Sequence, residues 1–191
     1  MTKSERFTEL NKTEYGADYN NLIFLNANEI LAATEKRAKI LDFLTTKVQT
    51  DFNGTKFDTA QLSAGCRLCG EGFWSCLFIS GKCNAACFYC PTSQDAEGVP
   101  ITNSIEFPTP EMYAAYVKKM GFKGVALSGG EPLLNFEKSI AYIKAVRELL
   151  GSELYIWIYT NGILATVEKM QQLHKAGVNE IRFDIGATNY S

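Results

Sequence analysis

The chain has 191 residues, of which 46% are hydrophobic and 21% are charged. This composition is close to the globular average, so the chain can bury a full core, and global disorder is excluded. The formal net charge is only −2 and no block of like charges occurs, which argues against an electrostatic binder of nucleic acids or membrane surfaces. The polar N-terminus contains no apolar signal core, and no stretch is long and apolar enough to span a bilayer. We therefore expect a cytoplasmic protein.

The first 75 residues are expected to form an extension, partly helical and partly irregular. Residues 1–26 are polar with scattered aromatic residues and show no clear period. A long helix is expected from Asn28, a plausible N-cap, up to the turn signal at Asn53-Gly54. Residues 55–75 are expected to be irregular. The sequence thus predicts two domains, the extension at 1–75 and a core at 76–191.

Strands and helices alternate in the core. Short apolar runs at 77–79, 125–127, 155–159 and 181–185 are expected to be strands, and Thr109, Asn135 and Thr166 are expected to cap the helices between them. This alternation predicts right-handed βαβ units and a parallel sheet. Little chain follows the fourth strand, which would leave an open edge. The sheet is then either small and open, or a fragment of a longer barrel.

All six cysteines lie within residues 66–90. A secreted disulfide scaffold would distribute its bridges over a small, loop-rich chain. A chain without a signal peptide that concentrates its thiols in one window is more typical of a metal or cluster protein. Three of the thiols, Cys83, Cys87 and Cys90, follow the first expected strand at spacings that let them converge. Cysteine thiolates are the usual ligands of [4Fe–4S] clusters, and three ligands leave one iron open to a small molecule.

Zinc is the first alternative, because structural zinc sites are usually closed by four protein ligands. A fourth cysteine could come from Cys66, Cys69 or Cys76. The single histidine, His174, falls in the last turn of an expected helix, where it favours the helix dipole. Three buried structural cysteines are the second alternative, which spacing alone does not exclude.

These motifs and their order resemble the radical S-adenosylmethionine (SAM) superfamily over residues 76–191. The matching motifs are Cys83-x-x-x-Cys87-x-x-Cys90 with Tyr89 before its last cysteine, Gly129-Gly130-Glu131-Pro132 after the second strand, and Thr160-Asn161-Gly162 after the third. Within the superfamily the chain looks most like the uncharacterised proteins related to pyruvate formate-lyase activating enzyme. The resemblance implies an α/β fold, namely a partial, truncated parallel β/α TIM-like barrel of about four strands after the N-terminal helical extension.

The resemblance also implies a radical SAM enzyme, and whether this chain is an incomplete, inactive fragment of one is left open by the sequence. Such an enzyme binds a [4Fe–4S] cluster and S-adenosyl-L-methionine. An electron from a flavodoxin or ferredoxin-type donor cleaves SAM reductively, and a 5′-deoxyadenosyl radical then abstracts hydrogen from the substrate. The substrate is unknown, with a glycyl-radical protein or a peptide among the open choices. The alternative is a non-catalytic iron–sulfur or zinc module for electron transfer or partner binding, which has no need for the Gly-Gly-Glu motif.

The site residues follow from the same resemblance. Cys83, Cys87 and Cys90 would bind the cluster. The expected SAM contacts are Tyr89, Gly129, Gly130, Glu131, Asn161 and Asp184. Among them, the glycines would let a ligand approach the backbone closely, Glu131 would meet the SAM amino group, and Tyr89 would line the adenine side. No residue is assigned a catalytic role.

A second metal site is possible upstream of the loop. Cys66-x-x-Cys69 has the spacing of a metal knuckle, and Cys76 follows just before the first strand. Three thiolates alone do not close a zinc tetrahedron, whereas an iron–sulfur cluster tolerates another fourth ligand. An auxiliary cluster is therefore favoured over zinc, and zinc or plain reduced thiols remain open.

Overall fold

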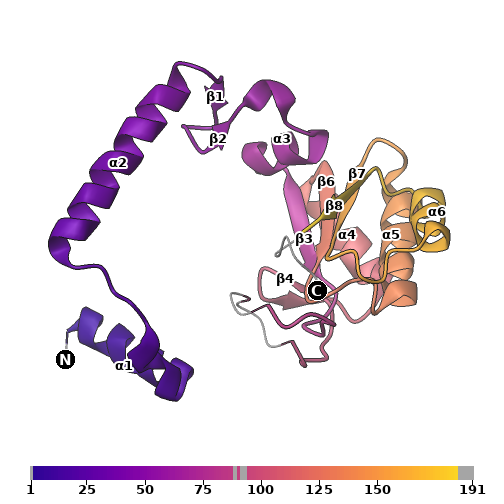
Figure 1. The fold of residues 1–191 in the computed structure, drawn as a ribbon. Coiled ribbons are helices and arrows are strands. Elements are labelled where there is room, and N and C mark those ends of the chain that lie inside the picture. The colour runs from indigo at the N-terminus through magenta and orange to yellow at the C-terminus, as the bar shows by residue number, and fades with distance from the viewer. Residues whose placement is uncertain (1, 88–89, 91–93, 185–191) are drawn as a thin grey trace. The chain divides into compact units, whose positions relative to one another are not determined.

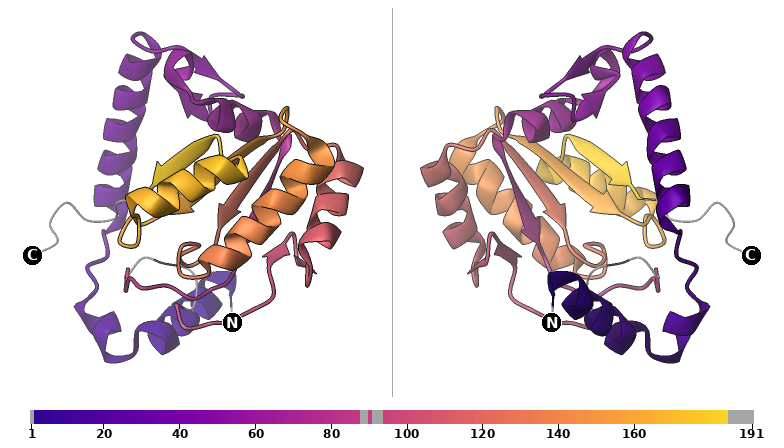
Figure 2. Two further views of the ribbon diagram at one scale, coloured as in Figure 1. Left: turned by 90° about the vertical axis from the view of Figure 1, so that its right-hand side faces the viewer. Right: turned by 90° about the vertical axis from the view of Figure 1, so that its left-hand side faces the viewer.

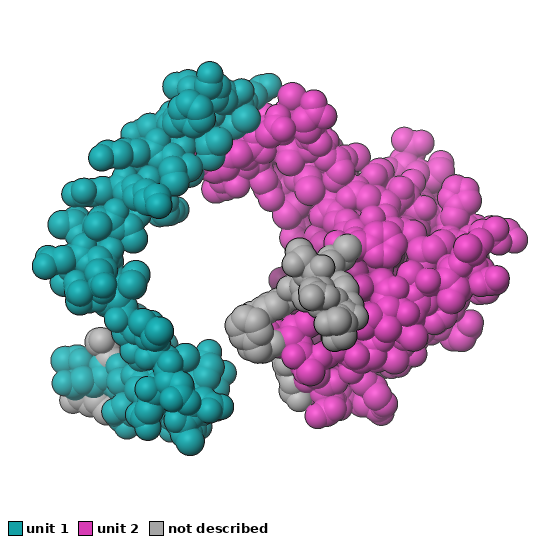
Figure 3. Space-filling model, in the orientation of Figure 1, with its two compact units in different colours: residues 1–49 teal, residues 50–191 magenta. Residues whose placement is uncertain are grey.

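The protein is described by a computed structural model that covers residues 2–87, 90 and 94–184. The chain forms two compact units, residues 1–49 and residues 50–191 (Figure 3). The domain boundary that the sequence predicts, after residue 75, lies inside the second unit. None of the described helices is long and apolar enough to cross a membrane.

The first unit begins with a helix that the sequence analysis did not predict. Helix α1 spans Lys3–Tyr15, and the short 3₁₀ helix η1 (Gly16–Asn21) follows. A capping box starts α1, since the Thr2 side chain accepts from the backbone N–H of Glu5 and the Glu5 carboxylate accepts from the backbone N–H of Thr2. Because this segment has no apolar period, the capping box is the sequence pattern from which the helix could have been predicted.

The second helix of this unit, α2, spans Ala27–Thr45. The prediction that Asn28 caps it was wrong by two residues, because Asn26 is the N-cap. The Asn26 side chain accepts from the N–H of Glu29 over 3.0 Å, and Glu29 accepts from the N–H of Asn26 over 2.7 Å. None of the residues of α2 is buried, so packing contributes little to its stability.

The second unit opens with a small hairpin of strands β1 (Thr50–Asp51) and β2 (Lys56–Phe57) and the turn η2 (Thr59–Gln61). Helix α3 (Ala64–Glu71) follows, in a stretch that the sequence analysis expected to be irregular. Ser63 is its N-cap and accepts from the N–H of Cys66 over 3.2 Å. Gly72, with φ of 78°, ends the helix in the left-handed conformation.

The central sheet has the strand order β5-β4-β3-β6-β7-β8. Figure 1 shows this sheet beside the helices of the same unit. Its four parallel strands are β3 (Trp74–Phe78), β6 (Gly124–Ser128), β7 (Tyr155–Thr160) and β8 (Glu180–Phe183), which confirms the predicted α/β fold. The antiparallel hairpin of β4 (Ile101–Thr102) and β5 (Ile105–Glu106) extends the sheet beyond β3 and was not predicted. Within the described ranges, no strand pairs with the outer edge of β8.

Three helices cover one face of this sheet (Figure 2). They are α4 (Pro110–Met120), α5 (Phe136–Leu150) and α6 (Val167–Ala176). Thr109 and Thr166 cap α4 and α6 as predicted. Asn135 precedes α5, but the prediction that its side chain caps the helix was wrong. Its amide donates to Oγ of Ser80 over 3.0 Å instead and so connects this helix to the segment after β3.

Alternate residues of each strand face opposite sides of the sheet. The helix-covered side holds the apolar core. Leu77, Leu127 and Ile156 belong to this core and are at most 1% exposed. The other side carries Trp157, and α3 packs there against β6 and β7. Gly124 makes this packing possible, because a Cβ at its position would lie 2.9 Å from both Leu68 of α3 and Trp157.

Candidate functional site

A cavity of about 460 Å³ lies at the carboxyl ends of the parallel strands. Ser128, Thr160 and Asp184, at or just after the ends of β6, β7 and β8, belong to its wall. Seven of the residues expected to bind the loop cluster or SAM line it, and these are Cys83, Cys87, Cys90, Gly129, Gly130, Asn161 and Asp184. Ligands bind at this edge in parallel α/β proteins, so the cavity is the candidate functional site.

The cysteine loop is shaped by hydrogen bonds within the chain. The N–H of Cys83 donates to the carbonyl of Gln94 over 2.8 Å, and the Gln94 side chain donates to the carbonyl of Cys87 over 3.1 Å. The N–H of Cys90 donates to the same Cys87 carbonyl over 3.0 Å. Gln94 therefore holds the beginning and the middle of the loop together. The sequence offered no signal for this role.

The donor set of the loop fits an iron–sulfur cluster. Cys83, Cys87 and Cys90 are all partly buried and border one cavity, and thiolates are the ligands that such clusters require. Among the residues that the structure describes, no three His, Cys, Asp or Glu side chains are grouped to hold a metal ion.

The two glycines after β6 lie against the start of the cysteine loop. A Cβ on Gly130 would be 2.1 Å from the carbonyl oxygen of Lys82, and one on Gly129 would be 2.4 Å from that of Ser80. The N–H of Gly130 donates to Ser80 over 2.8 Å, and the N–H of Glu131 donates to Lys82 over 2.9 Å. The sequence analysis expected these glycines to admit a ligand. In the structure they admit the protein's own backbone, which fixes the start of the loop.

Glu131 is only 1% exposed and is not part of the cavity wall. Its Oε1 accepts from the backbone N–H of Leu133 over 2.9 Å and from the hydroxyl of Thr160 over 2.8 Å. Its Oε2 accepts from the backbone N–H of Asn161 over 2.8 Å. Three donors therefore satisfy this buried carboxylate, and it joins the segment after β6 to the end of β7.

Asn161 contacts the cysteine loop from the opposite wall. Its side-chain nitrogen donates to Oδ1 of Asn84 over 2.8 Å and lies 3.9 Å from Sγ of Cys83. The Asn-Gly pair at 161–162 would by itself indicate a hairpin, but helix α6 follows it, as the sequence analysis expected. Asn84 was not predicted as a site residue, because its role depends on this long-range partner.

Two further expected SAM contacts remain. Asp184 is exposed on the cavity wall, and its backbone N–H donates to the carbonyl of Thr160 over 2.9 Å. Tyr89 lies outside the described residues. Tyr159, which the sequence analysis missed, also lines the cavity. Its place on the same strand face as Trp157 is the signal that could have identified it.

The upstream cysteines occupy different surroundings. Cys66 and Cys69 lie on α3, and Cys76 lies on β3 with its side chain at the cavity wall. Burial raises the pKa of Cys76 to about 11, and the neighbouring Cys69 adds to the shift. A metal ligand must be a thiolate, and burial disfavours that form at Cys76. A second metal centre at these three residues stays a prediction.

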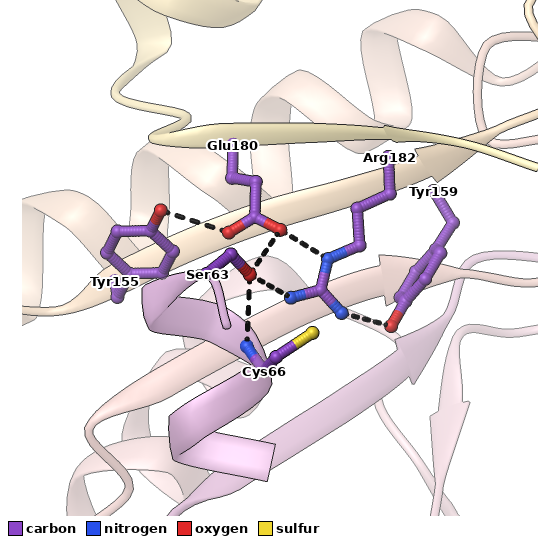
Figure 4. A network of polar contacts seen from close by, with 6 residues as sticks. All are labelled: Ser63, Cys66, Tyr155, Tyr159, Glu180 and Arg182. Carbon is purple, nitrogen blue, oxygen red and sulfur yellow. Dashed lines mark hydrogen bonds and ion pairs between the residues drawn. The ribbon is translucent and has the colours of Figure 1, made fainter. Parts of the chain in front are cut away.

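A polar network attaches α3 to the edge strand β8 (Figure 4). The Ser63 hydroxyl donates to Glu180 over 3.0 Å, the Tyr155 hydroxyl donates to the same carboxylate over 3.0 Å, and Arg182 forms an ion pair with it. Burial alone would raise the pKa of Glu180, but the bonds from Arg182, Ser63 and Tyr155 outweigh it and lower that pKa. The Arg182 guanidinium also lies 5.0 Å from the ring of Trp157.

Comparison with known proteins assigns the family. The sequence profile of the Radical SAM superfamily matches residues 77–190, which include the cysteine loop and all four parallel strands except the start of β3. The chain belongs to this superfamily of enzymes, whose members use a [4Fe–4S] cluster and SAM. This confirms the family predicted from the cysteine, Gly-Gly-Glu and Thr-Asn-Gly motifs.

Several curated proteins are similar to the chain over part of its length. One from Methanocaldococcus jannaschii, named as a candidate glycyl-radical enzyme activating enzyme, is 32% identical over 64% of the chain and 33% of that protein. A GTP 3′,8-cyclase of Corynebacterium glutamicum is 28% identical over 56% of the chain and 29% of its own length. The molybdenum cofactor biosynthesis protein 1 of Dictyostelium discoideum is 31% identical over 58% of the chain and 17% of its own length. The chain thus spans a third or less of these relatives. No solved structure matches it significantly.

Proposed function

We propose that the chain is the cluster- and SAM-binding part of a radical SAM enzyme. In this proposal Cys83, Cys87 and Cys90 bind a [4Fe–4S] cluster. The single observation that carries it is the cavity at the strand ends, which the three thiols share with Gly129 and Gly130. Asn161 and Asp184 line the same cavity and offer polar groups to a small ligand beside the thiols, which a metal module without SAM chemistry has no need for.

The bound cluster and SAM would supply the chemistry, namely one-electron cleavage of SAM to methionine and a 5′-deoxyadenosyl radical that abstracts hydrogen from the substrate. The chain's residues position these groups. Gly129 and Gly130 hold the loop against β6, and the exposed Asp184 offers a carboxylate to a polar group of SAM. Contacts of Tyr89 and Glu131 with SAM stay predictions, and the buried place of the Glu131 carboxylate does not favour a direct one.

The substrate and the partners belong to the same proposal. A flavodoxin or ferredoxin-type protein would deliver the electron. The activating-enzyme name of one relative supports a glycyl-radical protein or a peptide as substrate, whereas another relative is named for a reaction of GTP. A cytoplasmic location, as expected from the sequence, is part of the same proposal.

The test is the formation of 5′-deoxyadenosine. Reconstituted anaerobically with iron and sulfide, the protein should produce it from SAM when dithionite supplies electrons, and chromatography with mass detection measures it. The matched control is the Cys83→Ala, Cys87→Ala, Cys90→Ala variant, which should produce none. A cluster-loaded chain that binds SAM but gives no 5′-deoxyadenosine above this control would contradict the proposal and favour a non-catalytic cluster module.

A further inference from the structure

The amide of Asn161 is aimed at a sulfur that the proposed function assigns to the cluster. Its Nδ2 lies 3.9 Å from Sγ of Cys83, within the range of a hydrogen bond to sulfur. The second hydrogen of the same nitrogen is donated to Oδ1 of Asn84 over 2.8 Å. One side chain on the β7 side of the cavity therefore contacts two consecutive residues of the cysteine loop.

The orientation of this amide is fixed by the groups around it. Its Oδ1 accepts from the backbone N–H of Ile163 over 3.0 Å, so the nitrogen must point the other way, toward the loop. The backbone N–H of Asn161 donates to Oε2 of Glu131 over 2.8 Å. The Glu131 carboxylate is itself fixed by the N–H of Leu133 and the hydroxyl of Thr160. Asn161 is thus held from both its backbone and its side chain.

We infer that Asn161 tunes the cluster by donating its amide N–H to the Cys83 sulfur, and that Glu131 is a positioning residue that holds Asn161 in place. Reduction adds negative charge to the cluster and its thiolates. A donor to sulfur stabilises the reduced form more than the oxidised form and therefore raises the reduction potential. The inference rests on the proposed function, because it requires Cys83 to be a cluster ligand.

The test measures the midpoint potential of the reconstituted cluster in the absence of SAM, by a redox titration followed with electron paramagnetic resonance. Asn161→Leu keeps the size of the side chain and removes the donor. We expect the equilibrium between reduced and oxidised cluster to shift about tenfold toward the oxidised form, which is about 59 mV for a one-electron couple. An unchanged potential in a variant that holds the cluster would overturn the inference.

Two further variants complete the set. Asn161→Asp has nearly the native shape but replaces the donor by a negative charge, so the potential should fall at least as far. Asn103→Leu is the matched control. Asn103 does not line the cavity, and its side-chain amide donates a hydrogen bond to the hydroxyl of Tyr116. Its potential should equal that of the wild type. A fall of the same size in this control would show that the shift is not specific to Asn161.

Glu131→Gln separates positioning from a direct contact with SAM. Because Glu131→Gln also removes a negative charge, which by itself raises the potential, the positioning role is read from the pair of variants: if Glu131 holds Asn161, Asn161→Leu should lower the midpoint potential less in the Glu131→Gln background than in the wild-type background. If Glu131→Gln weakens SAM binding in calorimetry but leaves the fall caused by Asn161→Leu unchanged, the positioning role is wrong and the direct contact is supported.

A measurement on the wild-type protein needs no variant. With ¹⁵N in the side-chain amides of asparagine, pulsed resonance spectra of the reduced cluster should show a nitrogen coupling, and its absence would overturn the inference. Failure of the proposed function is distinguishable, because the wild-type protein would then either hold no cluster after reconstitution or hold one and form no 5′-deoxyadenosine, whereas failure of this inference leaves both properties intact.

Discussion

The hydroxyl of Ser63 lies 3.0 Å from the carboxylate of Glu180, and this bond connects residues that are 117 positions apart in the chain. Ser63 is the N-cap of α3, whereas Glu180 begins the edge strand β8. The helix that carries Cys66 and Cys69 is therefore part of the sheet unit. The contribution of this attachment to the free energy of unfolding can be measured without a bound cluster.

Ser63→Ala should destabilise the second unit by about 1–2 kcal/mol, because it removes an N-cap and leaves the Glu180 carboxylate with one donor fewer. The two tryptophans, Trp74 and Trp157, both belong to this unit, so tryptophan fluorescence during urea unfolding reports on it. Ser152→Ala, at an exposed position, is the matched control. Equal unfolding free energies for the two variants would show that the network does not hold α3.

The same network should make stability depend on acid pH. Because the pKa of Glu180 is lowered in the folded protein from its ordinary value of 4.5, the unfolded chain binds a proton at this residue before the folded chain does. The contribution is fully present above the ordinary pKa and is lost as the pH falls through the lowered one. The difference in unfolding free energy between wild type and Glu180→Gln should be constant above about pH 5 and shrink below it. A difference that is independent of pH down to 3 would contradict this.

Gly130→Ala should damage the cysteine loop, because the added Cβ would lie 2.1 Å from the carbonyl oxygen of Lys82. Overpacking of this kind costs about 1–3 kcal/mol, and the displaced loop should bind less iron after reconstitution. Gly98→Ala is the matched control, since a Cβ there meets nothing within 4 Å. Iron content and urea unfolding measure the two effects. Native values of both for Gly130→Ala would show that the loop tolerates a shift.

Iron analysis also tests the two sets of cysteines. The Cys83→Ala, Cys87→Ala, Cys90→Ala variant should lose its iron and the absorption near about 400 nm that iron–sulfur clusters give. The Cys66→Ala, Cys69→Ala variant tests the second site. If those residues hold an auxiliary cluster or zinc, it should lose that metal and keep the loop cluster. Wild-type iron and zinc in the second variant would identify Cys66 and Cys69 as ordinary thiols.

The parallel strands and helices α4 and α6 could be predicted from the sequence, because their apolar periods are strong and Thr109 and Thr166 are local caps. Helix α3 could not. It has only eight residues. A glycine inside a helix normally argues against it, and Gly65 is explained only by the close approach of Trp157 and Arg182, which leaves no room for a Cβ. The hairpin of β4 and β5 escaped prediction because each strand has two residues, too few for a period.

The site shows the same division. The spacing of Cys83, Cys87 and Cys90 is a local pattern and was visible in the sequence. The hydrogen bonds of Glu131 to Thr160 and Asn161 join residues about thirty positions apart, so only the fold reveals them. The glycine pair was recognised, but its neighbour is the backbone of Ser80–Lys82 and was expected to be a ligand.

The bonds that hold the cysteine loop have a consequence for maturation of the protein. Gln94 and the segment after β6 hold the described part of the loop through hydrogen bonds to its main chain, which no metal has to provide. Zinc fingers, in contrast, fold only when the metal binds. We therefore expect the second unit to stay folded when iron is withheld, so that the chain can take up a cluster after it has folded.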